Sequence, residues 1–236
     1  MEILRTDKLD TLRNFTKHNY LLGIVERNIP DGANTFFQRL MTKHLEITGQ
    51  IRKSSALSDF EIIFQDRIDK EIQTEAFYSK WLIDMSDVCK IFCDLQNSDA
   101  VDFCLSSQRG CRRYHIDNVP HRMLVTYAGK GTEWLPEEAA DRNAFANGEP
   151  NEKIVKDKSA LQFLKEWDVA VFCGGKNGLL HRTPDDALKE PSILLRLDHP
   201  FYWKNLLKHQ KQNGEYTVLR LSLIHISEPT RRRGIS

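Results

Sequence analysis

The sequence predicts an α+β fold in which a helical N-terminal layer packs on a β-rich C-terminal half. Apolar residues recur at helical spacing through roughly the first hundred positions. After that, short apolar or alternating segments dominate, and Gly or Pro separates most of them. Because helices precede strands, without βαβ alternation, the helices are expected to cover a sheet or barrel. We therefore predict a helical region over residues 1–98 and a β-rich region over 99–220.

Three helices are predicted in the N-terminal region. The stretch 31–35 supplies capping residues before the first apolar series, which should end at Gly49. Asp59 is placed to cap the second series, and the third has the strongest apolar stripe. The positions of the three stripes are Phe36, Phe37, Leu40, Met41 and Leu45; Phe60, Ile63, Phe64, Ile68 and Ile72; and Tyr78, Trp81, Leu82, Met85, Val88, Cys89 and Phe92.

Five strands are predicted after Asn97. In the first, Val101, Phe103 and Leu105 alternate with Asp102 and Cys104, the period of two that is typical of a strand. The other four are short runs over 122–127, 167–172, 178–182 and 192–198. A polar, helix-compatible insertion over 136–166 separates the second strand from the third.

Composition argues against several functional classes. Lys and Arg number 34 against 33 Asp and Glu, a net charge of +1 that gives no footprint of a nucleic-acid or membrane-surface partner. No stretch approaches ~18 uninterrupted apolar residues, and the first residues lack the apolar core of a signal peptide. Five scattered cysteines are typical of reduced thiols. We therefore expect a cytoplasmic protein that acts on a small molecule or a protein, with no nucleic-acid or membrane partner.

The C-terminal residues stand apart from the rest. From Leu221 to Arg231 the sequence resembles the in-frame translation of a transposase sequencing adapter, codon by codon. We therefore expect residues 221–236 to be non-native, and their consecutive arginines to say nothing about partners.

The most informative motif is His115-Ile116-Asp117. Residues two apart on an extended strand project to the same face, so this imidazole and carboxylate can bind one ion. A third ligand must come from elsewhere, and His181, in the run 178–182, is the best candidate. Two histidines and one carboxylate form a facial triad that leaves coordination positions open, as iron(II) oxygenases require.

Arg196 adds a second element to this hypothesis. It lies within the apolar run 192–198, where a lone arginine needs a carboxylate partner, and the distal carboxylate of 2-oxoglutarate would be one. The order His115, Asp117, His181 and Arg196 resembles that of the 2-oxoglutarate and iron(II) oxygenases. The resemblance implies a double-stranded β-helix (cupin-like) barrel, with Fe(II) on the first three residues and 2-oxoglutarate on Arg196.

A longer resemblance spans roughly residues 30 to 205. It rests on the segments 111–127 and 129–136, on His181-Arg182-Thr183-Pro184, and on Leu195-Arg196-Leu197-Asp198. Together these motifs resemble the domain of unknown function 1826 family. Membership of that family implies that the motifs belong to one site, but it names neither the metal nor the substrate.

Cys111 leaves the identity of the metal open. A thiolate four residues before His115 would favour zinc, and all four side chains would then form a closed structural or metal-handling site. His115, Asp117 and His181 with one water would instead form a hydrolytic zinc site. If Cys111 is only a small buried hydrophobe, the iron hypothesis stands. A third hypothesis is an interaction module that binds no metal.

Overall fold

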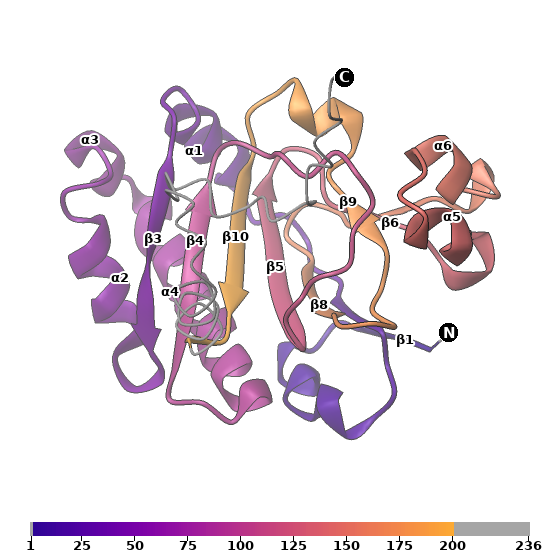
Figure 1. The fold of residues 1–236 in the computed structure, drawn as a ribbon. Coiled ribbons are helices and arrows are strands. Elements are labelled where there is room, and N and C mark those ends of the chain that lie inside the picture. Colours follow the sequence, from indigo (N-terminus) through magenta and orange to yellow (C-terminus); the bar gives the residue numbers. More distant parts are fainter. Residues whose placement is uncertain (1, 201–236) are drawn as a thin grey trace, which may run out of the picture.

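The computed structural model describes residues 2–200, and the adapter-like tail lies outside these described residues. The fold is built on a seven-stranded mixed sheet with the strand order β1-β2-β8-β5-β10-β4-β3 (Figure 1). Its neighbouring strands are antiparallel except β1 and β2, which are parallel. The strands are β1 (Ile3–Thr6), β2 (Leu22–Val25), β3 (Glu46–Arg52), β4 (Ala100–Ser106), β5 (His121–Ala128), β8 (Val169–Cys173) and β10 (Ile193–Asp198).

A small second sheet has the strand order β7-β6-β9. Its strands are β6 (Glu133–Trp134), β7 (Gln162–Phe163) and β9 (His181–Arg182). Residues of this sheet and of the main sheet share one apolar cluster, which includes Leu124, Trp134 and Phe172. The small sheet therefore packs on one face of the main sheet.

Helices cover the opposite face of the main sheet (Figure 1). These are α1 (Ala33–Leu40), α2 (Ala56–Phe64), α3 (Lys70–Gln73) and α4 (Ala76–Gln96), while α5 (Arg142–Ala146) and α6 (Asn151–Ile154) lie beyond the small sheet. Short 3₁₀ helices occupy Leu9–Lys17, Lys53–Ser55, Glu137–Ala139, Lys158–Ala160 and Asp185–Leu188.

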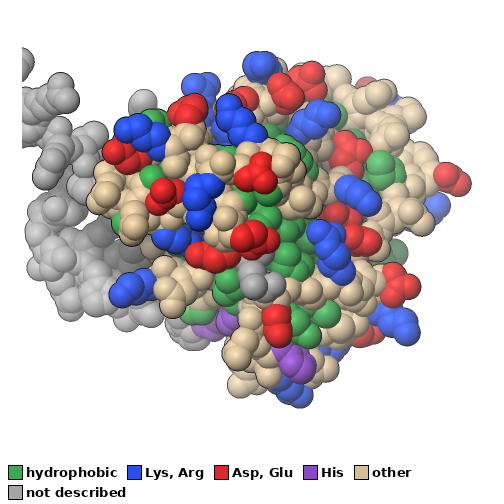
Figure 2. Space-filling view, turned by 90° about the vertical axis from the view of Figure 1, so that its right-hand side faces the viewer, with side chains coloured by type: hydrophobic (Ala, Val, Ile, Leu, Met, Phe, Trp, Pro, Cys, Tyr) green, Lys and Arg blue, Asp and Glu red, His purple; other side chains and the backbone are tan. Residues whose placement is uncertain are grey.

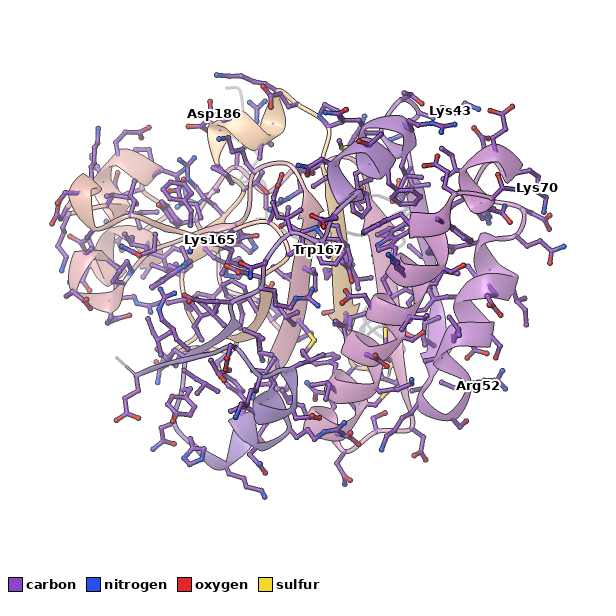
Figure 3. All side chains as sticks on the ribbon, turned by 180° about the vertical axis from the view of Figure 1, so that it is seen from behind. Lys43, Arg52, Lys70, Lys165, Trp167 and Asp186 are labelled. Atoms are coloured by element: carbon purple, nitrogen blue, oxygen red, sulfur yellow. The ribbon has the colours of Figure 1, made fainter. Side chains whose placement is uncertain are left out.

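The larger core lies between the helices and the main sheet. Alternate residues of β10 enter it, so that Leu195 and Leu197 face the helices while Leu194 faces the small sheet. Trp167, labelled near the middle of the molecule in Figure 3, contacts the rings of Phe37 and Tyr127 from the loop before β8. One face of the main sheet is thus buried under helices, and the small sheet covers part of the other face, which is exposed along β3.

The predicted α+β class is confirmed, but the N-terminal region is not purely helical. Strands β1, β2 and β3 all come from residues 1–98, and β3 pairs along its whole length with β4 on the other side of that boundary. Strands β1 and β2 have four residues each, too few to show a period of two.

Three helix-boundary predictions were wrong, and one of them is the second apolar series, which the structure divides between α2 and α3. The first helix ends at Leu40, and Gly49 lies inside β3 rather than at a helix end. A Cβ on Gly49 would lie 2.9 Å from the Phe103 ring, so the strand needs glycine for close packing. Asp59 lies within α2 and accepts a hydrogen bond from the Arg52 backbone N–H instead of capping the helix.

The strands predicted after Asn97 are largely confirmed, and α4 matches the strongest helical pattern. The exception is 178–182, of which only His181–Arg182 is a strand. The described residues form two separate sheets, and this pattern does not by itself confirm the cupin-like barrel.

The described part of the chain contains no helix that is both long and apolar enough to cross a membrane. On the face that carries α5 and α6, acidic and basic side chains are mixed (Figure 2). This mixture agrees with the near-neutral net charge of the whole sequence.

Candidate metal centre

The candidate site lies where the loop before β5 meets the small sheet. His115 and His181 form an isolated antiparallel bridge in which each backbone N–H donates to the carbonyl oxygen of the other, at 3.0 and 3.1 Å. Residues paired in this way project side chains to the same face, and the two imidazole rings have centroids 4.4 Å apart. This bridge brings together two histidines that are far apart in the sequence.

Asp117 completes a group of three metal-ligand side chains. One potential ligand atom from each of His115, Asp117 and His181 lies within 4.8 Å of the others. Asp117 and His181 are buried, and His115 is half-buried. The structure therefore brings together the three residues that the sequence singled out as ligands.

Backbone contacts set the tautomers of both histidines. Nδ1 of His115 lies 3.1 Å from the carbonyl oxygen of Arg113, and Nδ1 of His181 lies 3.0 Å from that of Leu179. Because a carbonyl oxygen only accepts, each Nδ1 carries the hydrogen and each neutral ring keeps a lone pair on Nε2. Burial, and then repulsion from His181, lower the pKa of His115 to about 4, which keeps this ring neutral at pH 7. Such orientation by a backbone carbonyl is common among metal-bound histidines.

The two oxygens of Asp117 have different surroundings. Oδ1 accepts a hydrogen bond from the Arg122 guanidinium, whereas Oδ2 is buried, has no hydrogen-bond partner among residues 2–200, and lies 3.4 Å from His181 Nε2. Burial alone would raise the pKa of Asp117, but Arg122 and the two histidines more than offset this and lower it. A buried anionic oxygen without a partner is costly, and a divalent cation would satisfy it. The residues present therefore fit a metal ion.

A series of ion pairs connects Asp117 through Arg122 to Asp198 and Arg196. Arg122 Nε donates to Asp198 Oδ1 at 2.8 Å, and Arg196 Nε lies 3.0 Å from Asp198 Oδ2. Asp198 is 2% exposed, so this carboxylate holds two guanidinium groups inside the protein. Arg196 thus has a carboxylate partner within the chain, whereas the sequence predicted that its partner would be a ligand.

The candidate ligands open into a pocket of ≈ 590 Å³, counting the space at its mouth. His115, His181 and Arg196 line this pocket, as does Cys111. Sγ of Cys111 does not belong to the group of ligand atoms within 4.8 Å of one another. Burial raises the pKa of the Cys111 thiol, so that it is a neutral thiol in the metal-free protein.

Family membership follows from a match that spans most of the chain. A family model described as "Protein of unknown function (DUF1826)" matches residues 6–198. The chain belongs to the DUF1826 family. A search of the curated proteins found no match.

The DUF1826 chain is also similar to solved structures of oxygenases. A dioxygenase for auxin oxidation from rice is 12% identical with a TM-score of 0.47, and the superposition covers 91% of this chain and 96% of the dioxygenase chain. The Fe(II)/α-ketoglutarate-dependent dioxygenase TqaL is 14% identical with a TM-score of 0.43, and the superposition covers 81% of this chain and 87% of TqaL. A 2OG-Fe(II) oxygenase family oxidoreductase from Burkholderia pseudomallei is 7% identical with a TM-score of 0.34, and the superposition covers 84% of this chain and 94% of the oxidoreductase. At these scores and identities the likeness does not establish a shared function.

Sequence reasoning missed several residues of this DUF1826 site. Arg122 pairs with Asp117 and is itself held by Asp198; both residues lie within the family motifs that the sequence assigned to one site, but neither of them was given a role from the sequence. Beside them, Glu133 is 2% exposed and accepts hydrogen bonds from the Tyr114 hydroxyl and from Arg182 Nε. No spacing in the sequence connects Tyr114, Glu133 and Arg182, because a loop and the two short strands β6 and β9 bring them together.

Gly174 presses against the backbone of the metal motif, which makes it sensitive to substitution. A Cβ there would lie 2.0 Å from the carbonyl oxygen of Val119 and 2.3 Å from that of Asp117, so the backbone would have to move. We expect Gly174→Ala to lower the free energy of unfolding by about 1–3 kcal/mol and to weaken metal binding, measured by urea denaturation and metal titration. Gly175→Ala is the comparison variant. Its new Cβ meets nothing within 4 Å, although an alanine is strained at the φ of +76° found there. Equal metal binding by both variants would contradict the prediction.

Arg122 is expected to act as a positioning residue for Asp117. Replacing it by methionine keeps an apolar stem but leaves the carboxylate without its charged hydrogen-bond donor. Since residues that orient metal ligands typically contribute about 10–100-fold in affinity, we expect Arg122→Met to weaken Mn(II) binding by that factor in equilibrium dialysis. Arg5→Met, which removes only the exposed pair with Glu26, is the matched control and should bind Mn(II) like the wild type. Unchanged affinity in Arg122→Met would show that Asp117 is held by other contacts.

Proposed function

We propose that this DUF1826 protein is an iron(II)- and 2-oxoglutarate-dependent oxygenase. His115, Asp117 and His181 hold the iron, and Arg196 binds the distal carboxylate of 2-oxoglutarate. The observation that carries the proposal is the convergence of two imidazoles and one carboxylate, with ligand atoms within 4.8 Å, at a pocket that also contains Arg196. Three protein ligands of this type leave positions open for a co-substrate and for oxygen.

The chain's own residues prepare the site for that chemistry. When bound, iron(II) would activate molecular oxygen, which is the oxidant, and 2-oxoglutarate would supply two electrons through its oxidative decarboxylation, so that one oxygen atom can enter the substrate. The two Nδ1–H groups hold the imidazoles so that Nε2 would be the ligand atom, and Arg122 keeps Asp117 ionised by donating to Oδ1, so that Oδ2 could bind the metal. Asp198 holds Arg196 at the pocket wall.

The architecture supports this assignment over a closed zinc site. The ligands lie at the junction of two facing sheets, in agreement with the double-stranded β-helix that the motif order implies. A closed tetrahedral site would require Cys111 as the fourth ligand, but its sulfur lies outside the group of close ligand atoms.

An anaerobic titration tests the proposed function. Adding iron(II) and 2-oxoglutarate to the metal-free protein should produce a weak visible charge-transfer band, and succinate in place of 2-oxoglutarate should not. Arg196→Met should require about tenfold or more 2-oxoglutarate for half-saturation, because a charge-assisted pair with a carboxylate is removed. If the wild type produces no band, and purified protein contains about one zinc per chain, the oxygenase proposal is wrong.

A further inference from the structure

Four arginines line the pocket that holds the candidate metal ligands. Three of them are matched with carboxylates: Arg122 with Asp117 and Asp198, Arg196 with Asp198, and Arg182 with Glu133 and Asp185. The charges of these three half-buried arginines are therefore compensated by the protein itself.

The fourth, Arg109, has only neutral acceptors within residues 2–200. One of its terminal nitrogens donates to the carbonyl oxygen of Lys130 at 3.1 Å, and the other donates to Thr132 Oγ1 at 2.9 Å. These bonds orient the guanidinium but leave its charge without an anion in the described part of the chain. Burial lowers the pKa of Arg109 to about 10, so that it is still a cation at neutral pH.

The charges of the pocket point to a monoanion. Three buried carboxylates, Asp117, Asp198 and Glu133, pair with three of the four arginines, whereas Asp185, the second partner of Arg182, is 69% exposed, so that solvent screens its charge. A divalent metal and a doubly charged 2-oxo acid would cancel each other, so the loaded pocket keeps one positive charge, which lies on Arg109. Arg109 is half-buried at the pocket wall, and a cation that is partly removed from water and has no counter-ion favours a ligand with one negative charge.

Arg109 also stands between two cavities. Together with Gln108 it lines the metal pocket and a neighbouring groove that is bordered by Lys43, His44 and Lys189. An anionic group at Arg109 would therefore sit at the border of the metal pocket, with the rest of the molecule able to extend over Leu124 and Leu194, which line the same pocket.

From these contacts we propose that Arg109 is a substrate-binding residue and that the substrate is a small organic acid whose carboxylate pairs with it. This rests on the proposed oxygenase function, since the charge balance includes the metal and the 2-oxo acid. The guanidinium fork suits a carboxylate. A phosphate monoester carries up to about two charges at pH 7 and fits the single uncompensated charge less well.

The test compares matched acidic and neutral probes. Protein loaded with Mn(II) and N-oxalylglycine, which are inert stand-ins for iron and 2-oxoglutarate, is titrated with hexanoate, hexanamide and hexyl phosphate in a calorimeter. We expect hexanoate to bind at least tenfold more tightly than hexanamide and more tightly than hexyl phosphate. Equal affinities for hexanoate and hexanamide, or a preference for hexyl phosphate, would overturn the carboxylate assignment.

Variants separate a binding role of Arg109 from a structural one. Arg109→Gln should lose the preference for hexanoate over hexanamide, and Arg109→Lys should keep part of it, while both keep wild-type Mn(II) affinity. Thr132→Val removes one hydrogen bond of Arg109 but not its charge, and should keep the preference. If Thr132→Val loses the preference as completely as Arg109→Gln, the arginine only holds the loop and the proposal is wrong.

The two proposals fail in different ways. If the wild type does not bind Mn(II) and N-oxalylglycine, the proposed function fails, and the same probes are then titrated into metal-free protein. An acid preference that disappears in Arg109→Gln would still support the anion site, and its absence there would overturn it.

Discussion

Asp117→Ala is expected to reduce the affinity for Mn(II) or iron(II) by more than about 100-fold. The substitution removes one of three ligands and its buried anionic oxygen, a larger change than the about 10–100-fold effects of residues that only orient ligands. Titration of Mn(II) followed by electron paramagnetic resonance measures this loss directly. Saturating Mn(II) should also raise the melting temperature of the wild type but not that of the variant, because only a folded state that binds the ion is stabilised.

The matched control for this substitution is Asp186→Ala. The side chain of Asp186 is 74% exposed, and its only ion pair within residues 2–200 is with Lys189 three residues away, so its removal should leave metal affinity unchanged. Arg122 keeps its bond to Asp198 when Asp117 is removed, so the variant is expected to fold. Wild-type affinity in Asp117→Ala would exclude the proposed metal centre altogether.

Trp81→Ala is expected to lower the free energy of unfolding by about 3–5 kcal/mol, the usual cost of removing a fully buried large aromatic side chain. Trp81 is 0% exposed on α4, and its ring lies 5.5 to 6.1 Å from those of Phe36, Phe37 and Tyr127. These contacts join α1, α4 and β5, so the substitution opens a cavity where the helical layer meets the main sheet. Urea denaturation followed by far-ultraviolet circular dichroism measures the loss.

Ile83→Ala on the same helix provides the comparison. Ile83 is 50% exposed, so its truncation should cost less than about 1 kcal/mol. Similar losses in Trp81→Ala and Ile83→Ala would mean that α4 does not pack on the sheet as described. Because Trp81 lies in the helix-side core and the metal ligands lie on the other face of the sheet, folded Trp81→Ala should bind Mn(II) like the wild type.

Elements with long periodic patterns could be predicted from the sequence. The apolar stripe from Tyr78 to Phe92 specifies a helix because each turn repeats the same face, and α4 confirms it. Strands β4 and β10 were recognisable for a similar reason. Strand β3 was missed because only its pairing with β4 and the contact of Gly49 with Phe103 distinguish it from the end of a helix.

The candidate site, like the fold, could be predicted from the sequence only in part. The spacing of His115 and Asp117 is local and sufficed to propose two ligands, and the chain order suggested His181. What no spacing contains is the bridge between His115 and His181, which depends on how a loop meets a two-residue strand. The same holds for the ion pair between Arg122 on β5 and Asp198 on β10. These two strands are far apart in the sequence and become neighbours only in the folded sheet.

The sequence by itself determined the chemistry that is available, namely two imidazoles, a carboxylate and an arginine in an α+β chain of near-neutral charge. Only the tertiary structure decided which nitrogen of each histidine can bind, which oxygen of Asp117 lacks a partner, and which pocket arginine lacks a carboxylate. The physical reason is that side-chain identity and local spacing set the direction in which neighbours project. Burial and charge compensation, by contrast, depend on contacts between strands that are far apart in the chain.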